Sequence, residues 1–289
     1  MALVKTIIVT YNGEHYIEKC IASVLNSSIQ TDIIIIDNNS TDNTVKIISE
    51  KFPSVELIRS NKNHGFGKAN NIGISRAIKN DLDYILLLNQ DAYLKKNTIE
   101  GLIQIHKKNR DYGILSPIHY NNNNSIDNLF YKNIGGNFTK NVGVSEVKFI
   151  NAAIWLISSE CINVNGGFMP IFPHYGEDDN YCHRVRFSGY KIGYCPNLTA
   201  IHDRGDRKKS LSINYHFNRT YVALLTIFTN PFNNKKRTIA NELLKFIMQN
   251  FSRIHVMILM PLAFLKILLK YKSVINDKNQ SLERNINFL

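Results

Sequence analysis

The chain has 289 residues, 44% of them apolar, which is enough for one large domain with its own hydrophobic core. Its formal net charge is +12, and residues 204–289 contribute +11 of it, with 15 Lys and Arg against 4 Asp and Glu. Because almost all of the positive charge lies in the C-terminal segment, the protein is not uniformly basic. It indicates an anionic partner for the C-terminal segment, such as a membrane surface, a lipid diphosphate or a nucleic acid. The alternative is a solvated basic tail.

The first 116 residues alternate between short apolar runs and amphipathic stretches. The apolar runs predict strands at 3–10, 32–37, 55–59, 84–88 and 113–116. The spacing of apolar residues between them predicts helices at 14–25, 40–51, 68–78 and 97–109, with Ser40 as the cap of the second helix. Strands and helices that alternate with short connections favour a mostly parallel, doubly wound sheet.

The alternation ends after Pro117. Residues 144–158 predict one or two strands, and the later pattern predicts a helix at 177–188 and strands at 191–195 and 198–202. From about residue 210 the chain becomes helical. We therefore expect a catalytic domain at 1–210, divided into a nucleotide-binding half at 1–116 and an acceptor and catalytic half at 117–210, and then a basic helical segment at 211–289.

The C-terminal segment contains a short apolar stretch. Only twelve residues separate Arg253 from Lys266, whereas roughly 20 apolar residues are needed to span a membrane. With Lys245, Lys270 and Lys272 nearby, the stretch predicts an amphipathic helix that lies in a membrane interface. The alternative is a core helix docked on the catalytic domain.

The four cysteines have none of the paired spacings that are typical of zinc or redox sites. We expect reduced, buried thiols and therefore a cytoplasmic protein. A strand is predicted from residue 3 onward, so we expect no signal peptide ahead of it.

Polar turns follow the first two predicted strands, at Thr10-Tyr11-Asn12-Gly13 and at Asp37-Asn38-Asn39-Ser40. The carboxyl ends of neighbouring parallel strands face one crevice, where open α/β sheets bind ligands. Their hydroxyl, amide and carboxylate groups suit a pyrimidine base and a ribose, although a simple turn would use the same residues. The glycines of residues 63–71 permit close approach of a ligand to the backbone. The first turn lacks the dinucleotide fingerprint, which disfavours NAD binding.

Three acidic or imidazole-bearing positions carry the predicted chemistry. Asp91 follows the fourth strand, where it can reach a Mg²⁺ or Mn²⁺ that holds a diphosphate; the alternative is a helix cap. Glu177-Asp178-Asp179 stands at a predicted helix start, and Asp178 is the candidate general base. His202 ends an apolar strand, and beside these carboxylates we expect it to be the second metal ligand rather than a structural histidine.

These motifs, in this order, resemble glycosyltransferase family 2, an inverting family, and most closely its rhamnosyltransferase-like bacterial branch. The resemblance covers about residues 3–230. It implies an α/β fold of the GT-A type, with a Rossmann-like, mostly parallel central sheet flanked by helices, followed here by the C-terminal helical segment. Asn89 stands where many relatives have the first aspartate of the DXD-type motif, and Gln90 where this branch usually has proline.

The resemblance implies a role for each matching residue. The nucleoside would be held by Thr10, Asn12, Asp37 and Asn38, and the donor site completed by Tyr11, Gly65, Asn70, Asn89 and Gln90. Asp91 and His202 would bind the metal, and Asp178 would be the base.

The expected reaction is inverting transfer from a nucleoside-diphosphate sugar, dTDP-rhamnose or a UDP-sugar, with Mg²⁺ or Mn²⁺. The acceptor would be a hydroxyl of a glycan or of a lipid-diphosphate-linked sugar in bacterial surface polysaccharide synthesis. We expect a peripheral protein at the inner face of the plasma membrane. No nucleic-acid motif accompanies the basic segment, so we expect no nucleic-acid partner. Two alternatives are a sugar nucleotidyltransferase and a non-catalytic GT-A-like binding subunit. The sequence leaves the oligomeric state open.

Overall fold

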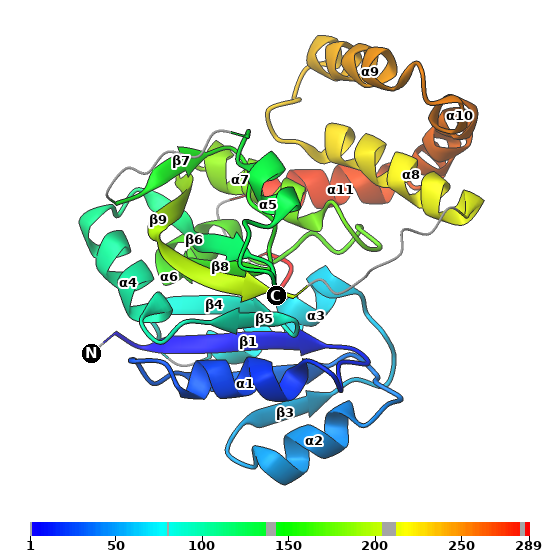
Figure 1. Ribbon diagram of the computed structural model, residues 1–289. Helices are drawn as coiled ribbons and strands as arrows, with labels where there is room; N and C mark the ends of the chain where they lie inside the picture. Colours follow the sequence, from blue (N-terminus) through cyan, green and yellow to red (C-terminus); the bar gives the residue numbers. More distant parts are fainter. Residues whose placement is uncertain (1, 80, 137–142, 204–211, 284–286) are drawn as a thin grey trace.

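A computed structural model describes residues 2–79, 81–136, 143–203, 212–283 and 287–289. Within these residues, one nine-stranded sheet runs in the order β3-β2-β1-β4-β8-β6-β9-β5, with β7 paired to β9 (Figure 1). The N-terminal half of the sheet is parallel and consists of β1 (Val4–Thr10), β2 (Asp32–Asp37), β3 (Glu56–Arg59) and β4 (Tyr84–Asn89).

The other half of the sheet is mixed. It consists of β5 (Ala92–Leu94), β6 (Tyr112–Tyr120), β7 (Ser145–Val147), β8 (Ile154–Ser158) and β9 (Lys191–His202). Strand β8 pairs antiparallel with both β4 and β6, and β9 runs parallel to β6. Since β8 joins the two halves, the parallel sheet expected from the sequence changes direction beyond β4.

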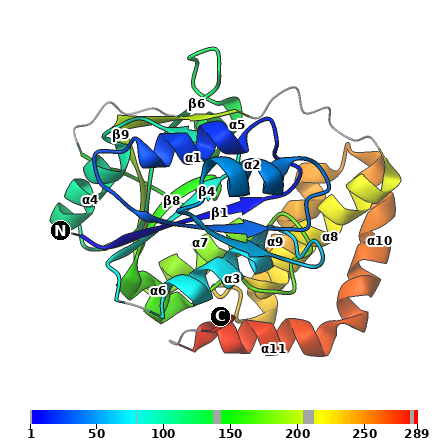
Figure 2. The same ribbon diagram turned by 90° about the horizontal axis from the view of Figure 1, so that it is seen from below.

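Helices cover both faces of the sheet, because its central strands are apolar on both sides. Helices α1 (Ile17–Leu25), α2 (Thr44–Lys51) and α4 (Thr98–Lys108) pack on one face. Helices α3 (Phe66–Ala77), α6 (Ser159–Asn165) and α7 (Glu177–Phe187) pack on the other. Figure 2 shows α1 and α2 on the opposite side of the sheet from α3 and α6. The short helix α5 (Asn128–Asn133) follows β6.

Four further helices form the C-terminal segment: α8 (Ile213–Thr229), α9 (Lys236–Asn250), α10 (Ile254–Leu269) and α11 (Tyr271–Leu282). Figure 1 shows them grouped beside α7. Met169 and Phe172, which precede α7, share one buried cluster with apolar residues of α8, α10 and α11. The segment is therefore packed against the catalytic domain. The expected boundary at residues 210 and 211 lies outside the described residues.

Helix α10 is buried along one face and exposed along the other. Four of its apolar residues are buried, and the helix packs along α8, as a docked core helix would. Its other face stays exposed. No helix in the described residues has both the length and the apolar composition to cross a membrane alone. Helices α10 and α11 meet that requirement only as a pair, and they are bent by 72° where they join.

Several local predictions differ from the structure. Ser40 does not cap α2, which begins at Thr44 with Asn43 at its N-cap position; the Ser40 hydroxyl instead accepts the Asn12 N–H at 3.0 Å. The two strands predicted at 191–195 and 198–202 are one strand, β9, whose pairing with β6 shifts register between Pro117 and Ile118. The short elements β5, α5 and α6 had not been predicted. All four cysteines are free and buried, as expected.

Candidate active site

The carboxyl ends of β1, β2 and β4 lie side by side at one edge of the sheet. Thr10 at the end of β1 is in register with Asp37 of β2, and Val9 is in register with Asn89 of β4. Apolar runs hold these strands in the centre of the sheet, so that polar groups gather at their ends. The two polar turns therefore lie next to each other, as the sequence predicted.

A cavity of about 590 Å³ opens at this edge of the sheet, within the range of about 300–1,000 Å³ that is usual for small-molecule sites. We call it the donor cavity. Six of the predicted site residues line it: Tyr11, Asn38, Gly65, Asn89, Gln90 and Asp91. Pro173 and His174 also line it. Sequence reasoning missed these two because they lie in a stretch without a motif, shortly before the acidic one.

Gln90 closes the floor of the donor cavity. Its Oε1 accepts the Thr10 hydroxyl at 2.6 Å and the Tyr11 N–H at 2.9 Å, while its Nε2 donates to the Tyr11 carbonyl at 3.2 Å. A Cβ atom on Gly13 would overlap the Gln90 amide. A side chain at position 13 would therefore displace Gln90, which ties the end of β4 to the end of β1.

Asn38 holds the opposite wall. Its Oδ1 accepts the His64 N–H at 2.7 Å, and its Nδ2 donates to Asn63 Oδ1 at 2.9 Å. Gly65, which follows His64 in the chain, has φ +78°. A Cβ atom at this position would lie 2.8 Å from the carbonyl oxygen of Pro173. The glycine thus allows two backbone segments to approach each other beside the cavity.

The other four predicted donor residues, Thr10, Asn12, Asp37 and Asn70, do not line the cavity. Asp37 accepts the Ser40 N–H at 3.3 Å, and Asn12 accepts a backbone N–H from the same turn at 2.8 Å. Asn70 lies inside α3 and donates to a carbonyl one turn earlier at 3.0 Å. The side chains of Asn12 and Asp37 therefore shape the turns that carry lining residues.

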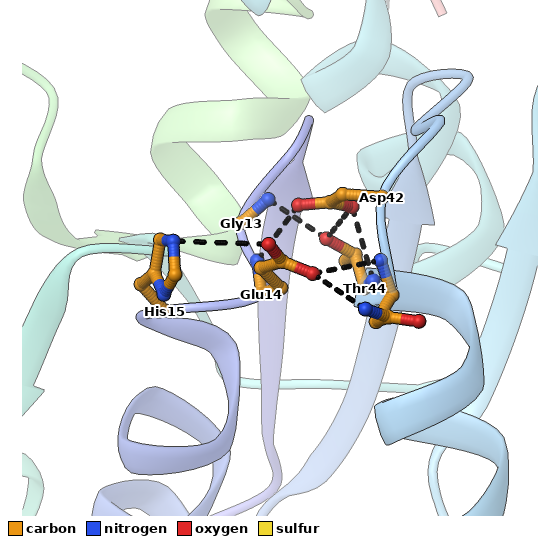
Figure 3. A network of polar contacts seen from close by, with 6 residues as sticks. Gly13, Glu14, His15, Asp42 and Thr44 are labelled. Atoms are coloured by element: carbon orange, nitrogen blue, oxygen red, sulfur yellow. Dashed lines mark hydrogen bonds and ion pairs between the residues drawn. The ribbon is translucent and has the colours of Figure 1, made fainter.

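A polar network joins the turn after β1 to the turn after β2 (Figure 3). The Thr44 hydroxyl accepts the Gly13 N–H at 2.7 Å and donates to Asp42 at 2.5 Å. Glu14 accepts both the backbone and the side-chain N–H groups of Asn43. Although burial raises the pKa of Asp42, the hydrogen bonds from Thr44 and Glu14 outweigh it and hold the pKa below its ordinary value. The two turns therefore form one rigid unit.

Asp91 and His202 meet beside the donor cavity. Ala92 of β5 is in register with His202 of β9, which places the His202 Nε2 atom 3.5 Å from Asp91 Oδ1, with both side chains buried. Neither ring nitrogen of His202 has a hydrogen-bond partner within the described residues. A buried imidazole nitrogen without a partner, beside a carboxylate oxygen, is a donor set that fits a divalent cation. The described residues include no cluster of three His, Cys, Asp or Glu.

The acidic motif begins α7. Asp178 is half-buried, and its carboxylate accepts the Asp179 N–H at 3.0 Å and the Ala152 N–H. Burial raises the pKa of Asp178, while these hydrogen bonds and the charge of Arg219 lower it in part. Ala152 immediately precedes Ala153, whose carbonyl accepts the Asn89 N–H at 2.9 Å. Asp178 is therefore anchored next to the strand that carries Asn89.

The two neighbouring carboxyl groups are also perturbed. Burial, with the charge of Asp178 as the second cause, raises the pKa of Glu177 to about 8 and that of Asp179 to about 7. Strong perturbation of several carboxyl groups in one place is typical of catalytic sites. The Asp179 and Ala152 N–H groups and the charge of Arg219 stabilise the anion of Asp178 against the effect of burial on its pKa.

The fold and the motifs define a glycosyltransferase of the GT-A type. The sequence profile of Glycosyl transferase family 2 matches residues 6–159, more than half of the chain. The chain therefore belongs to glycosyltransferase family 2, as the sequence motifs predicted.

Two curated relatives and one solved structure illustrate the similarity. A low-salt glycan biosynthesis hexosyltransferase of Haloferax volcanii is 25% identical over 238 residues, which cover 77% of this chain and 76% of the relative. An N-acetylglucosaminyl-diphospho-decaprenol L-rhamnosyltransferase of Mycobacterium tuberculosis is 21% identical over 251 residues, which cover 75% and 82%. A mannosyltransferase of Pyrobaculum calidifontis, solved with GDP-Man and Mn²⁺, superimposes with a TM-score of 0.61 at 14% identity over 94% of this chain and 75% of that one. The GT-A fold predicted from the sequence is confirmed.

Proposed function

We propose that the protein transfers a sugar, with inversion, from a nucleoside-diphosphate sugar to a hydroxyl of a glycan or a lipid-diphosphate-linked acceptor in bacterial surface polysaccharide synthesis. The donor would be dTDP-rhamnose or a UDP-sugar. The observation that carries the proposal is the pairing of Asp91 with His202 at 3.5 Å beside the donor cavity. A relative whose name states rhamnosyl transfer to a decaprenol-linked acceptor supports the acceptor class.

In this mechanism the nucleoside lies in the donor cavity, between the polar turns after β1 and β2. Asp91 and His202 would hold Mg²⁺ or Mn²⁺ at the diphosphate. When bound, the cation supplies positive charge that stabilises the leaving nucleoside diphosphate. Asn38, Asn89 and Gln90 line the cavity and can position the donor through hydrogen bonds.

Asp178 would act as the general base. The acceptor oxygen forms a bond to the anomeric carbon while the bond from that carbon to the diphosphate breaks, and the acceptor proton moves to the Asp178 carboxylate. Burial raises the pKa of this carboxyl group, which makes it a stronger base than an exposed aspartate. Because the attack and the departure are concerted on opposite faces, the anomeric configuration inverts.

A panel of nucleoside-diphosphate sugars with Mn²⁺ tests the proposal. A ligand that binds only the folded state raises the melting temperature. We expect one donor to do so, and to release its nucleoside diphosphate when an acceptor is added. Pyrophosphate release from a nucleoside triphosphate and a sugar phosphate would instead indicate a nucleotidyltransferase. Donor binding without transfer to any acceptor would indicate a binding subunit.

We further propose an anionic membrane surface, at the inner face of the plasma membrane, as the partner of α10. Its outer face exposes a row of apolar side chains, each more than half exposed: Ile254, Ile258, Leu262, Leu265 and Leu269. At 100° per residue these positions fall within an arc of about 80°. Exposed Arg253, Lys270 and Lys272 flank the row. An apolar row flanked by basic residues is typical of helices that lie in a membrane interface.

Co-sedimentation with liposomes containing phosphatidylglycerol tests this partner. We expect binding that weakens with salt, because basic residues contribute about 1 kcal/mol each near an anionic surface. Ile258→Glu and Leu262→Glu should release the protein, whereas the matched exposed change Leu25→Glu on α1 should not. Equal sedimentation of all three variants would remove the membrane from the proposal.

A further inference from the structure

A second hollow lies next to the acidic motif. It has a volume of about 340 Å³ and is formed by the start of α7 together with α8 and α9. We call it the α8–α9 groove. Consecutive residues divide between the two hollows, because Pro173 and His174 line the donor cavity whereas Tyr175 and Gly176 line the groove. The groove and the donor cavity are therefore lined by neighbouring residues of one segment.

The groove combines an apolar floor with polar groups at its rim. Val222, Ala223 and Phe246 contribute the floor, and Asp179, Arg219 and Gln249 contribute carboxylate, guanidinium and amide groups. None of these three polar side chains makes a hydrogen bond within the described residues. Such groups in a concave site are available to a ligand that offers several donors and acceptors.

The charges along the groove balance. Glu242 pairs with Lys245 at 2.6 Å, and Asp179 lies in the field of Arg219. The lining therefore has two acidic and two basic side chains and no cluster of cations, which favours a neutral ligand over a phosphate. A neutral ligand rich in hydroxyl groups, with an apolar face, matches both the polar rim and the apolar floor.

Tyr175 adds an aromatic face at the rim. Its side chain is 48% exposed, and its backbone has φ +68°, a left-handed conformation that side chains other than glycine rarely adopt. The Arg219 guanidinium lies 5.6 Å from the centre of the ring. Strained residues of this kind concentrate at ligand sites, where the surrounding structure holds them in place.

We infer that the α8–α9 groove binds a neutral sugar residue of the acceptor, an inference that rests on the proposed function. Asp179, Arg219 and Gln249 bind its hydroxyl groups, and the Tyr175 ring packs against its apolar face. Asp178 and Asp179 are consecutive on a helix, so their side chains point about 100° apart. Asp179 therefore faces the groove while Asp178 faces Ala152, at the side of the donor cavity.

The groove also gives the C-terminal segment a second role. Helices α8 and α9 supply most of its lining.

Filling the groove tests the inference. Ala223 lines it, and Ala223→Phe should block it; Ala240 is exposed on α9 outside the groove, so Ala240→Phe is the matched control. The probes are octyl glucoside, octyl mannoside and octyl N-acetylglucosaminide, with the corresponding free sugars, observed by saturation-transfer NMR in the presence of UDP and Mn²⁺. Binding of both the free and the octyl forms indicates recognition of the sugar, and binding of the octyl forms alone indicates recognition of the chain.

We expect at least one free sugar to bind, and Ala223→Phe to weaken its binding at least about tenfold, because the side chain occupies the same space. Ala240→Phe should bind it normally. Gln249→Ala is a milder change at an exposed residue of the groove, and it should also weaken binding of the free sugar. Its matched control is Gln104→Ala on α4, which should bind the sugar normally.

The outcomes separate this inference from the proposed function. If the wild type binds a nucleoside-diphosphate sugar and both groove variants bind the free sugar as well as it does, the groove assignment is wrong and the transferase proposal stands. Absence of any bound free sugar also overturns the groove assignment. If the wild type binds no nucleoside-diphosphate sugar, the proposed function itself is wrong.

Discussion

Replacing Glu177 with glutamine should change how the stability of the protein depends on pH. Glu177 is 4% exposed, and its Oε2 atom is buried without a hydrogen-bond partner in the described part of the chain. Burial, with the charge of Asp178 second, raises its pKa from 4.5 to about 8. The folded state therefore holds this proton more tightly than the unfolded state.

The sign of the effect follows from that difference. The contribution of Glu177 to stability is fully present below about pH 4.5 and is lost as the pH rises through about 8. Between pH 6 and pH 9 the loss is about 2 to 3 kcal/mol, since each pKa unit corresponds to about 1.4 kcal/mol. Glutamine has no proton to lose, so Glu177→Gln should not show this loss.

Urea unfolding at pH 6 and pH 9 measures the effect. The free energy of unfolding of the wild type should fall between the two pH values by about 2 to 3 kcal/mol more than that of Glu177→Gln. Glu160→Gln is the matched control, because Glu160 also stands in the first turn of a helix but is exposed. It should follow the wild type. Parallel pH dependence of the wild type and Glu177→Gln would refute the reasoning.

Four further substitutions test the site. Asp91→Ala and His202→Ala should each weaken Mn²⁺-dependent donor binding at least about tenfold; unchanged binding, also with EDTA, would exclude the metal pair. Gly13→Ala should displace Gln90 and lower donor affinity, measured by calorimetry, and a wild-type affinity would show that Gln90 does not shape the cavity. Asp178→Asn should keep donor affinity, and its turnover rate should fall at least ~10²-fold. A variant that keeps more than about a tenth of the wild-type turnover rate would exclude Asp178 as the base.

The N-terminal half of the fold could be predicted because its strands are long apolar runs. Residues 32–37, for example, form β2 with the expected bounds. The mixed half could not, because its pairing depends on contacts distant in sequence. Strand β5 has only three residues and forms by pairing with β9. The pairing of β5 with β9 brings Asp91 next to His202. No pattern in the sequence near either residue predicts that these two strands pair.

The site divides in the same way. The polar turns were visible because polar groups directly follow apolar strands, and the acidic motif because three consecutive carboxylates stand at a helix start. Pro173 and His174 were not visible, since they reach the donor cavity only through the packing of the segment before α7. The prediction that Ser40 caps α2 was wrong. The Ser40 hydroxyl instead accepts the N–H of Asn12, which lies in the turn after β1. The α8–α9 groove required the docking of the C-terminal helices, which composition alone could not establish.

The anomeric configuration of the product tests the central claim most directly. Proton NMR during transfer from an α-linked UDP-sugar with an equatorial 2-substituent distinguishes the product anomers by the splitting of the anomeric proton signal. If Asp178 deprotonates an acceptor that attacks in a single displacement, the wild type forms only the inverted, β-linked product, and Asp178→Asn forms almost none. An α-linked product, or a β-linked product formed equally fast by the variant, would contradict the account.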